Sequence, residues 1–443
     1  MIENLFRTEE LKALARRKSR DQEFRTVRNV DIPEHLAQGW LVQRKNKATT
    51  RLFRPKPQDI LLQDRVWSLL YAMDFTHLSG EGNAILRQAR TKNEGEINQL
   101  GVVGLDLDIA IAIGCKSAPA PRRDSSFAEY LADHNLIRER FANAANTQFP
   151  LDHKRVPVLA MFTSNLMLSE REIEKAQEQK VALFNENDLA YYEQLISHLG
   201  PAAKYQFFAD MLPGKKIHGL QIAVPALEAK MGKHTCFTFS ITPEALLKIA
   251  YVSHRAKGKA TDVDTYQRMI KKSRLKKIRQ YINQNGVFPT NIVLSLEGRR
   301  TVRFEKSSQQ GGPEGARYGT LHLAPAYRSA WIIDGQHRLF AYSGLQRAKT
   351  AYLSVLAFQN LPASQQAQLF IDINHEQKSV KRNLLQELYA ELNWDADDED
   401  KRIGAIVSKA VQALNEDREY LFTGLAPAAG LCRRVVGDCG ELY

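Results

Sequence analysis

Apolar runs of strand length alternate with helical segments between residues 61 and 213. Residues 107–117 (LDIAIAIGCKS) have a two-residue alternation, which predicts a strand buried on one face, and residues 156–164 (VPVLAMFTS) form a continuous apolar run. Residues 64–75 place apolar side chains on one helical face, and residues 126–143 form another helical segment. Strands that alternate with helices are typical of α/β proteins, so we expect an α/β domain over residues 61–213.

The N-terminal 60 residues have a different pattern. Residues 11–24 (LKALARRKSRDQEF) have helical spacing without glycine or proline, and residues 41–57 are basic and end in prolines. We therefore expect residues 1–60 to form a helix and a basic arm. Farther along, Ser169 precedes a charged helical segment and is a candidate N-cap.

A polar segment at residues 214–219 (GKKIHG) is predicted to link a second domain to the first. We expect the second domain over residues 218–400, in which paired strands with a charged turn come before further helices and strands. A long helix is expected over residues 379–392 (SVKRNLLQELYAEL). Residues 401–443 are expected to form a C-terminal helical segment.

The composition is that of a soluble globular protein, with 44% hydrophobic and 25% charged residues. The N-terminal residues are charged and no stretch of 18 apolar residues occurs, so we expect neither a signal peptide nor a membrane span. Four scattered cysteines show no spacing typical of a disulfide framework or a zinc site, which predicts a cytoplasmic protein. The net charge of +12 and the pI near 9.4 favour a polyanionic partner.

The most distinctive stretch is WIIDGQHRLF (331–340), in which an apolar strand turns into a helix at one glycine. Gly335 permits a backbone conformation that a Cβ would resist. The N–H groups that open a helix attract anions, and His337 and Arg338 would add positive charge. These residues predict a phosphate-sized anion site, in which Asp334 orients Arg338, binds a metal ion or caps the helix. The alternative is a structural turn in which Arg338 only pairs with Asp334.

A second feature is the helical segment YQRMIKKSRLKKIRQYI (266–282), in which seven of seventeen residues are Lys or Arg and none is acidic. A helix face of one charge sign repels itself unless a polyanion neutralises it, and phosphate contacts release counterions. The segment therefore predicts DNA binding through Arg268, Lys271, Lys272, Arg274, Lys276, Lys277 and Arg279. The alternative is a surface helix whose charge is balanced by acidic residues such as those of residues 395–400 (DADDED).

The DGQHR signature resembles the DGQHR-domain family, which includes regulators of DNA phosphorothioation of the DndB kind and relatives in deazaguanine DNA-modification clusters. Residues 368–380 (QLFIDINHEQKSV) resemble that family's downstream helix, and the likeness covers residues 218–400. It implies a ParB/sulfiredoxin-like α+β fold whose turn binds nucleotide phosphates. The implied catalytic residues are Asp334, His337 and Arg338, and the implied phosphate- or nucleotide-binding residues are Gly335, Gln336, Asn374 and Gln377. For Asn374 and Gln377 the alternative is a polar helix face.

Residues 96–104 (EINQLGVVG) and the strand that follows resemble the motif strands of the Mrr-like restriction-endonuclease fold, which carry E-I-D and E-x-K. That family's Asp and Glu bind a divalent cation, and its Lys helps to position the attacking water. In this chain Asn and Gly replace the two carboxylates, so no metal site is expected. Rescue by Glu96, Asp106 or Asp108 is the alternative. The remnant motif residues are Glu96, Asn98, Gly114 and Lys116.

These features predict an α/β protein of a bacterial DNA-modification or defence system. An inactive endonuclease-like domain would precede a DGQHR domain that binds DNA and a nucleotide or phosphate group. If the chain hydrolyses nucleotide, the cofactor is ATP or another nucleotide with Mg²⁺, and Arg338 stabilises phosphate charge. The expected partners are DNA and other proteins of a DNA-modification gene cluster. Two alternatives are a purely regulatory DNA-binding protein that represses modification genes, and an active metal-dependent endonuclease.

Overall fold

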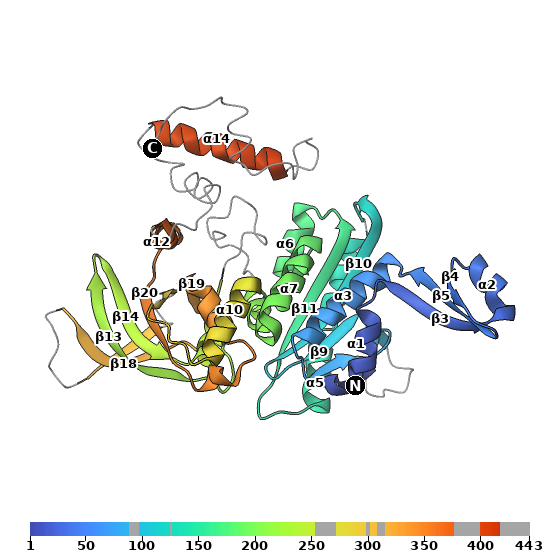
Figure 1. The fold of residues 1–443 in the computed structure, drawn as a ribbon, viewed down its shortest axis with the longest axis horizontal. Coiled ribbons are helices and arrows are strands. Elements are labelled where there is room, and N and C mark those ends of the chain that lie inside the picture. The colour runs from blue at the N-terminus through green and yellow to red at the C-terminus, as the bar shows by residue number, and fades with distance from the viewer. Residues whose placement is uncertain are drawn as a thin grey trace. The chain divides into compact units, whose positions relative to one another are not determined.

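The chain forms two compact units, Met1–Ile196 and Ser197–Tyr443. Both units mix helices and strands (Figure 1), which confirms the α/β class. Among the helices that are described, none combines the length and the hydropathy that a membrane span requires. The helix expected at residues 379–392 lies outside the described residues. The computed structural model describes residues 1–87, 97–124, 126–252, 272–297, 302–307, 315–375 and 399–416.

A six-stranded sheet with helices packed against it forms the body of the first unit (Figure 1). Its central strand β10 pairs in parallel with β11 and antiparallel with β9. In sheet order the strands are β12 (Val181–Phe184), β11 (Val156–Leu166), β10 (Ile109–Arg122), β9 (Val102–Leu105), β6 (His77–Ser79) and β2 (Leu5–Arg7). The helices of the body are α1 (Lys12–Lys18), α3 (Gln58–Ala72), α4 (Phe127–Leu136), α5 (Arg138–Gln148), α6 (Glu170–Glu178) and α7 (Glu186–Leu199).

The IAIAI run of β10, residues 109–113, is buried on both faces of the sheet. All five residues are 0% exposed, so the expectation of a single buried face is wrong. Ala110 and Ala112 belong to a core cluster with Phe127 of α4 and Phe141 of α5. The side chains therefore alternate in size and not in polarity. The small alanines leave space for two helices to pack on one face of the sheet, and the isoleucines point to the opposite face. Burial on both faces is typical of a central strand in an α/β sheet.

The strand expected over residues 96–104 is divided at Gly101. Its second part is β9, and its first part, β8 (Ile97–Leu100), joins a separate three-stranded sheet. A Cβ at Gly101 would lie 2.5 Å from the carbonyl oxygen of Ile113 in β10, so the close approach of β10 requires glycine at this point. The order of the small sheet is β1 (Ile2–Glu3), β7 (Ala84–Arg87) and β8.

A basic arm, residues 19–56, extends from the body of the first unit (Figure 1). Its antiparallel sheet has the order β3 (Gln22–Arg28), β5 (Thr49–Pro55) and β4 (Leu41–Lys45), with α2 (Ile32–Ala37) between β3 and β4. Val27, Trp40 and Leu52 form its small core. The helix expected over residues 11–24 ends at Lys18, so that prediction is wrong in its second half. Tertiary pairing overrides the local helical pattern, because β3 pairs with β5 along its whole length.

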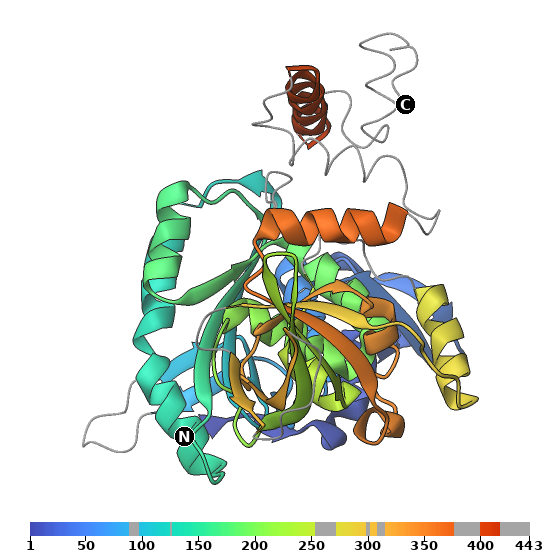
Figure 2. The ribbon, with the colours of Figure 1, turned by 90° about the vertical axis from the view of Figure 1, so that its left-hand side faces the viewer.

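The second unit contains one eight-stranded mixed sheet. Strand β16 is parallel to β20 and antiparallel to β19, and α12 packs against β19 (Figure 2). In sheet order the strands are β15 (Ala250–Tyr251), β19 (Ala330–Asp334), β16 (Ile292–Leu296), β20 (Leu353–Gln359), β14 (His234–Ile241), β13 (Ile222–Met231), β18 (Arg317–Leu323) and β17 (Val302–Lys306). Its helices are α8 (Ala203–Met211), α9 (Pro243–Ile249), α10 (Lys272–Asn283), α11 (Gln336–Phe340), α12 (Ala363–His375) and α14 (Glu399–Glu416).

The buried His134 of α4 predicts a pH-dependent stability for the first unit. Burial lowers the pKa of His134 below its ordinary value of 6.5, so the ring is neutral in the folded state. As the pH falls below 6.5, the unfolded chain binds a proton that the folded chain resists, and stability is lost. We expect the urea midpoint of the first unit to fall between pH 8 and pH 5 and to fall less in His134→Phe. Equal pH dependence in both proteins would contradict this assignment.

Candidate functional site

The strand-to-helix turn predicted for the DGQHR motif is present. Strand β19 ends at Asp334, Gly335 has φ +96° and ψ 7°, and α11 begins at Gln336. A Cβ at Gly335 would lie 2.6 Å from Ile292 Cδ1 and 3.1 Å from Arg338 Nη2. The left-handed backbone and the close neighbours therefore both require glycine at this position.

Arg338 is held by acceptors of the protein itself. Its Nη2 donates to Asp334 Oδ2 at 2.9 Å, and its Nη1 donates to the carbonyl oxygen of Thr290 at 2.6 Å. The hydroxyl of Thr290 accepts a further hydrogen bond from the same Nη1. Thr290 lies just before β16, so the arginine joins the DGQHR turn to the neighbouring strand. This is the pairing of Arg338 with Asp334 that the sequence left open as an alternative.

The turn is only partly accessible to solvent. The side chains of Arg338 and Asp334 are 15% and 26% exposed, whereas Gln336 is buried at 6% exposure. Burial lowers the pKa of Arg338, and the charge of Arg274 lowers it further against the opposing effect of Asp334. Arginine stays protonated at neutral pH despite such a shift. The turn therefore holds a charged, largely buried arginine paired with Asp334.

Helix α10 lies directly beside the DGQHR helix α11. Leu275 and Ile282 of α10 are buried, which fixes the inward face of the helix. Four cations of α10 are exposed, and no carboxylate among the described residues pairs with them. They are Lys272, Arg274, Lys276 and Lys277. The structure thus brings together two features that are more than fifty residues apart in the sequence.

The other residues predicted for these two sites are placed differently. Arg279 Nε donates to the carbonyl oxygen of Ala341 at 3.2 Å, and its Nη2 donates to that of Ser343 at 3.3 Å. This arginine therefore fastens α10 to the chain that follows α11. His337 is half-buried beside Arg338. Asn374 lies in the last turn of α12, and its side chain is not among the described ones; Arg268, Lys271 and Gln377 lie outside the described residues.

Residues 224–424 match the family model DndB, described as DNA-sulfur modification-associated. The likeness to DndB proteins that the DGQHR motif indicates is therefore confirmed for most of the second unit. This match, which covers somewhat less than half of the chain, links the protein to DNA modification by sulfur. No curated protein matches the chain.

Among solved structures, the crystal structure of protein VC1899 from Vibrio cholerae matches part of the chain. The two chains are 14% identical with a TM-score of 0.25, and the match covers 44% of this chain and 50% of that chain. The matched part therefore spans half the length of that protein. A TM-score this low carries no argument about the fold, so the nuclease-like fold of the first unit stays a prediction.

In the first unit, the positions of the expected nuclease motif lie on two strands of different sheets. Asn98 is in β8, where it pairs with Leu86, while Gly114 and Lys116 are in β10; Glu96 lies outside the described residues. A Cβ at Gly114 would lie 2.5 Å from Met161 Sδ and 3.0 Å from the Tyr130 hydroxyl. The space that a catalytic glutamate would need is therefore already filled by neighbouring side chains.

Lys116 has a carboxylate partner that the motif does not supply. Its Nζ lies 2.9 Å from Asp124 Oδ2 and donates to Ser126 Oγ at 2.9 Å, above the ring of Tyr130. The Lys116 ammonium and the Ser126 hydroxyl lower the pKa of Asp124 to about 2. Next to Lys116, burial raises the pKa of the Cys115 thiol to about 12, so the thiol is not a nucleophile at neutral pH.

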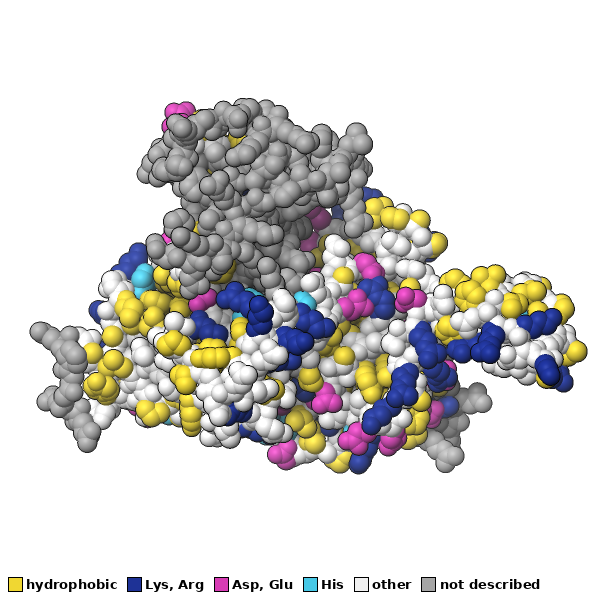
Figure 3. All heavy atoms as spheres, viewed as in Figure 1, with side chains coloured by type: hydrophobic (Ala, Val, Ile, Leu, Met, Phe, Trp, Pro, Cys, Tyr) yellow, Lys and Arg dark blue, Asp and Glu magenta, His cyan; other side chains and the backbone are white. Residues whose placement is uncertain are grey.

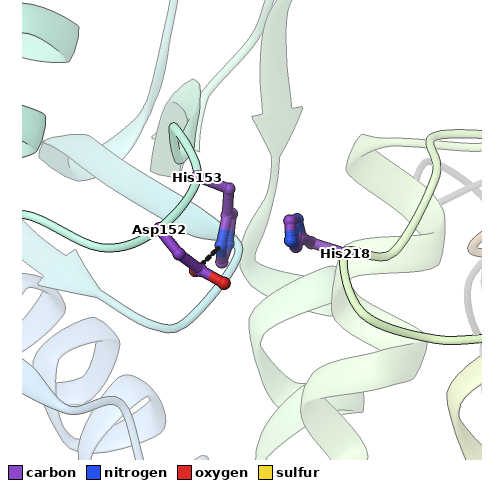
Figure 4. Close-up of side chains that lie close together, drawn as sticks. All are labelled: Asp152, His153 and His218. Carbon is purple, nitrogen blue, oxygen red and sulfur yellow. Dashed lines mark hydrogen bonds and ion pairs between the residues drawn. The ribbon is translucent and has the colours of Figure 1, made fainter.

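Asp106 and Asp108, the carboxylates considered as replacement ligands, are at the opposite end of β10. Eight residues separate Asp108 from Lys116, which is roughly 26 Å along an extended strand at about 3.3 Å per residue. Asp108 lies 3.4 Å from Nε2 of His153, and Nδ1 of that ring is 2.7 Å from Asp152 (Figure 4). In the described part of the first unit taken by itself, no three carboxylate, histidine or cysteine side chains gather as a metal-ligand set.

Two residues of these sites, Thr290 and Asp124, were not identified from the sequence. Thr290 lies 48 residues before Arg338, and no local pattern marks it as the partner of that arginine. Asp124 is the first acidic residue after Lys116, which is a weak signal. An extended strand would carry it away from Lys116, but the pairing of β10 with β11 shifts register between Ser117 and Arg122. Such irregularities can bring residues together, and sequence spacing does not predict them.

Proposed function

We propose that the protein is a DNA-binding component of a DNA-sulfur modification system and that α10 supplies its main contact with the phosphate backbone. The observation that carries this proposal is the set of four exposed cations on α10, which no described carboxylate balances. Exposed cations on a helix contact phosphates irrespective of sequence and release counterions. The match of residues 224–424 to a DNA-sulfur modification family supports DNA as the polyanion.

In this proposal the DGQHR turn acts as the support of the DNA-binding helix. Gly335 positions α11, Arg338 ties the turn to Thr290, and Arg279 ties α10 to the carbonyl groups after α11. Arg274 is close enough to Arg338 to lower the pKa of Arg338. A phosphate bound by α10 would therefore also be attracted by the positive charge of Arg338. The ParB/sulfiredoxin-like fold is proposed for the same region on the strength of the DGQHR signature and the strand–glycine–helix order.

Regulation without catalysis is favoured over nucleotide hydrolysis. Hydrolysis would require Arg338 to stabilise a transferred phosphate with Mg²⁺ nearby, but its guanidinium already donates to Asp334 and Thr290. Binding of a nucleotide would have to replace those hydrogen bonds. The first unit is proposed to act without nuclease chemistry, because neighbouring side chains fill the space beside Gly114 and Lys116 pairs with Asp124. Other proteins of the modification gene cluster are its proposed partners.

Titration of the full chain with labelled duplex DNA, ATP or CTP, each with and without Mg²⁺, tests this function. We expect duplex DNA to bind with an affinity that falls steeply between about 50 and 200 mM salt, as phosphate contacts require. Neither phosphate release from the nucleotides nor metal-dependent cutting of the DNA is expected. Hydrolysis that is lost in Arg338→Ala would overturn the non-catalytic assignment, and salt-independent DNA binding would overturn the role of α10.

A further inference from the structure

The basic arm, together with the last three residues of α1 that precede it, carries most of the excess positive charge of the chain. Residues 16–56 hold twelve Lys and Arg against four Asp and Glu, so this segment accounts for +8 of the total net charge of +12. Figure 3 shows Lys and Arg side chains, in dark blue, along the arm and on the adjoining body. So large an excess in a short segment repels itself and favours a polyanionic partner.

At the tip of the arm, three cations have no carboxylate partner among the described residues. Arg44, Lys45 and Lys47 surround the turn of the β4–β5 hairpin, and all three are exposed. No carboxylate within the described part of the chain pairs with them. At the base of the arm the situation is the reverse, because Lys56 lies 2.8 Å from the buried carboxylate of Asp64. Exposed positive charge without a described carboxylate partner is therefore concentrated around this turn.

Between base and tip, arginines are held against aromatic rings. The guanidinium carbons of Arg20 and Arg51 lie 5.5 and 4.8 Å from the ring centre of Phe24. That of Arg25 lies 5.3 Å from the ring of Trp40 in the same way. A guanidinium that is stacked in advance loses less freedom when it binds a phosphate. Because the rings are covered by arginines, they are not open platforms for stacking unpaired bases, which disfavours single-stranded nucleic acid.

We propose that the arm is a second DNA contact, in which the β4–β5 hairpin lies along duplex DNA and binds its phosphates. Arg44 and Arg51 face each other across the two strands, so cations occupy both strands of the hairpin. The seven residues of β5 extend over roughly 23 Å at about 3.3 Å per residue, the axial length of about seven phosphates of one DNA strand. The inference extends the proposed DNA binding to the first unit but depends on different residues.

The test is a titration of labelled duplex DNA with the full chain in which Arg44, Lys45 and Lys47 are changed to glutamine. None of these side chains packs in the core of the arm, so the fold is expected to persist, which thermal unfolding would verify. We expect the affinity near 0.1 M salt to fall by about tenfold or more. The slope of log K against log salt should decrease by about 2 to 3, because three phosphate contacts are lost.

The matched control changes Lys12, Lys154 and Arg171 to glutamine, which removes the same charge from exposed positions outside the arm. Equal losses in the control and the arm variant would show an effect of net charge alone and would overturn the inference, as would an unchanged slope in the arm variant. A loss seen with duplex RNA but not with duplex DNA would also overturn it. If the arm variant loses affinity while neutralised α10 does not, the inference stands and the proposed function of α10 fails.

Discussion

Replacing the four exposed cations of α10 by glutamine is expected to weaken DNA binding by about 100-fold near 0.1 M salt. The reason is counterion release: each phosphate contact contributes about 0.9 to the slope of log K against log salt. Four lost contacts should lower the slope by about 3.6, and the remaining affinity should depend less on salt. Fluorescence anisotropy of a labelled duplex across a salt series measures both quantities. The four residues are Lys272, Arg274, Lys276 and Lys277.

A matched control keeps the same net charge change but leaves α10 intact. Four exposed lysines of the second unit serve this purpose, since no described carboxylate pairs with them. They are Lys215, Lys230, Lys233 and Lys349. Their replacement by glutamine is expected to leave the slope within about one unit of the wild-type value, since long-range charge acts weakly through screening salt. If control and α10 variants lose affinity equally, binding follows net charge and α10 is not a specific contact surface.

Local signals in the sequence predicted local structure well. Ser169 begins α6 with a capping box: its side chain accepts the Glu172 N–H, and the Glu172 carboxylate accepts the Ser169 N–H at 2.7 Å. The left-handed turn at Gly335 is likewise a property of one residue and its neighbours. Such features are readable because partners lie within a few positions of one another along the chain.

Features that depend on distant partners were missed or wrong. The IAIAI run of β10 looked half-buried because alternation in size resembles alternation in polarity, and only the helices on both faces distinguish the two. Residues 22–24 continue the local helical pattern, and only their pairing with β5 shows that they form a strand. The pairing of Arg338 with Thr290 depends on β16 and β19 being neighbours, and that of Lys116 with Asp124 depends on a register shift. Sequence spacing reveals neither which strands are neighbours nor where a register shifts, although it identifies the charged residues of α10 and of the DGQHR turn.

The second large effect is expected from Gly335→Ala, which should destabilise the second unit by about 2–4 kcal/mol. Part of the loss is the cost of φ +96° for a residue with a Cβ, about 1–2 kcal/mol. The rest comes from contacts, since the new methyl would lie 2.6 Å from Ile292 Cδ1 and 3.2 Å from its Cα. Urea unfolding measures the loss, and hydrogen exchange of the peptides that cover β19 and α11 locates it.

Gly344→Ala separates the two causes of that loss. Gly344 also has a positive φ, +74°, but no heavy atom lies within 4 Å of a Cβ built there, so only the backbone cost of about 1–2 kcal/mol is expected. The difference between the free energies of unfolding of the two variants then measures the cost of the close contacts with Ile292 of β16 and with Arg338. In Gly335→Ala, displacement of Arg338 should also loosen α11 beneath α10 and weaken DNA binding, whereas Gly344→Ala should leave binding unchanged. Equal destabilisation and equal binding in both would mean that the DGQHR turn does not support the DNA-binding helix.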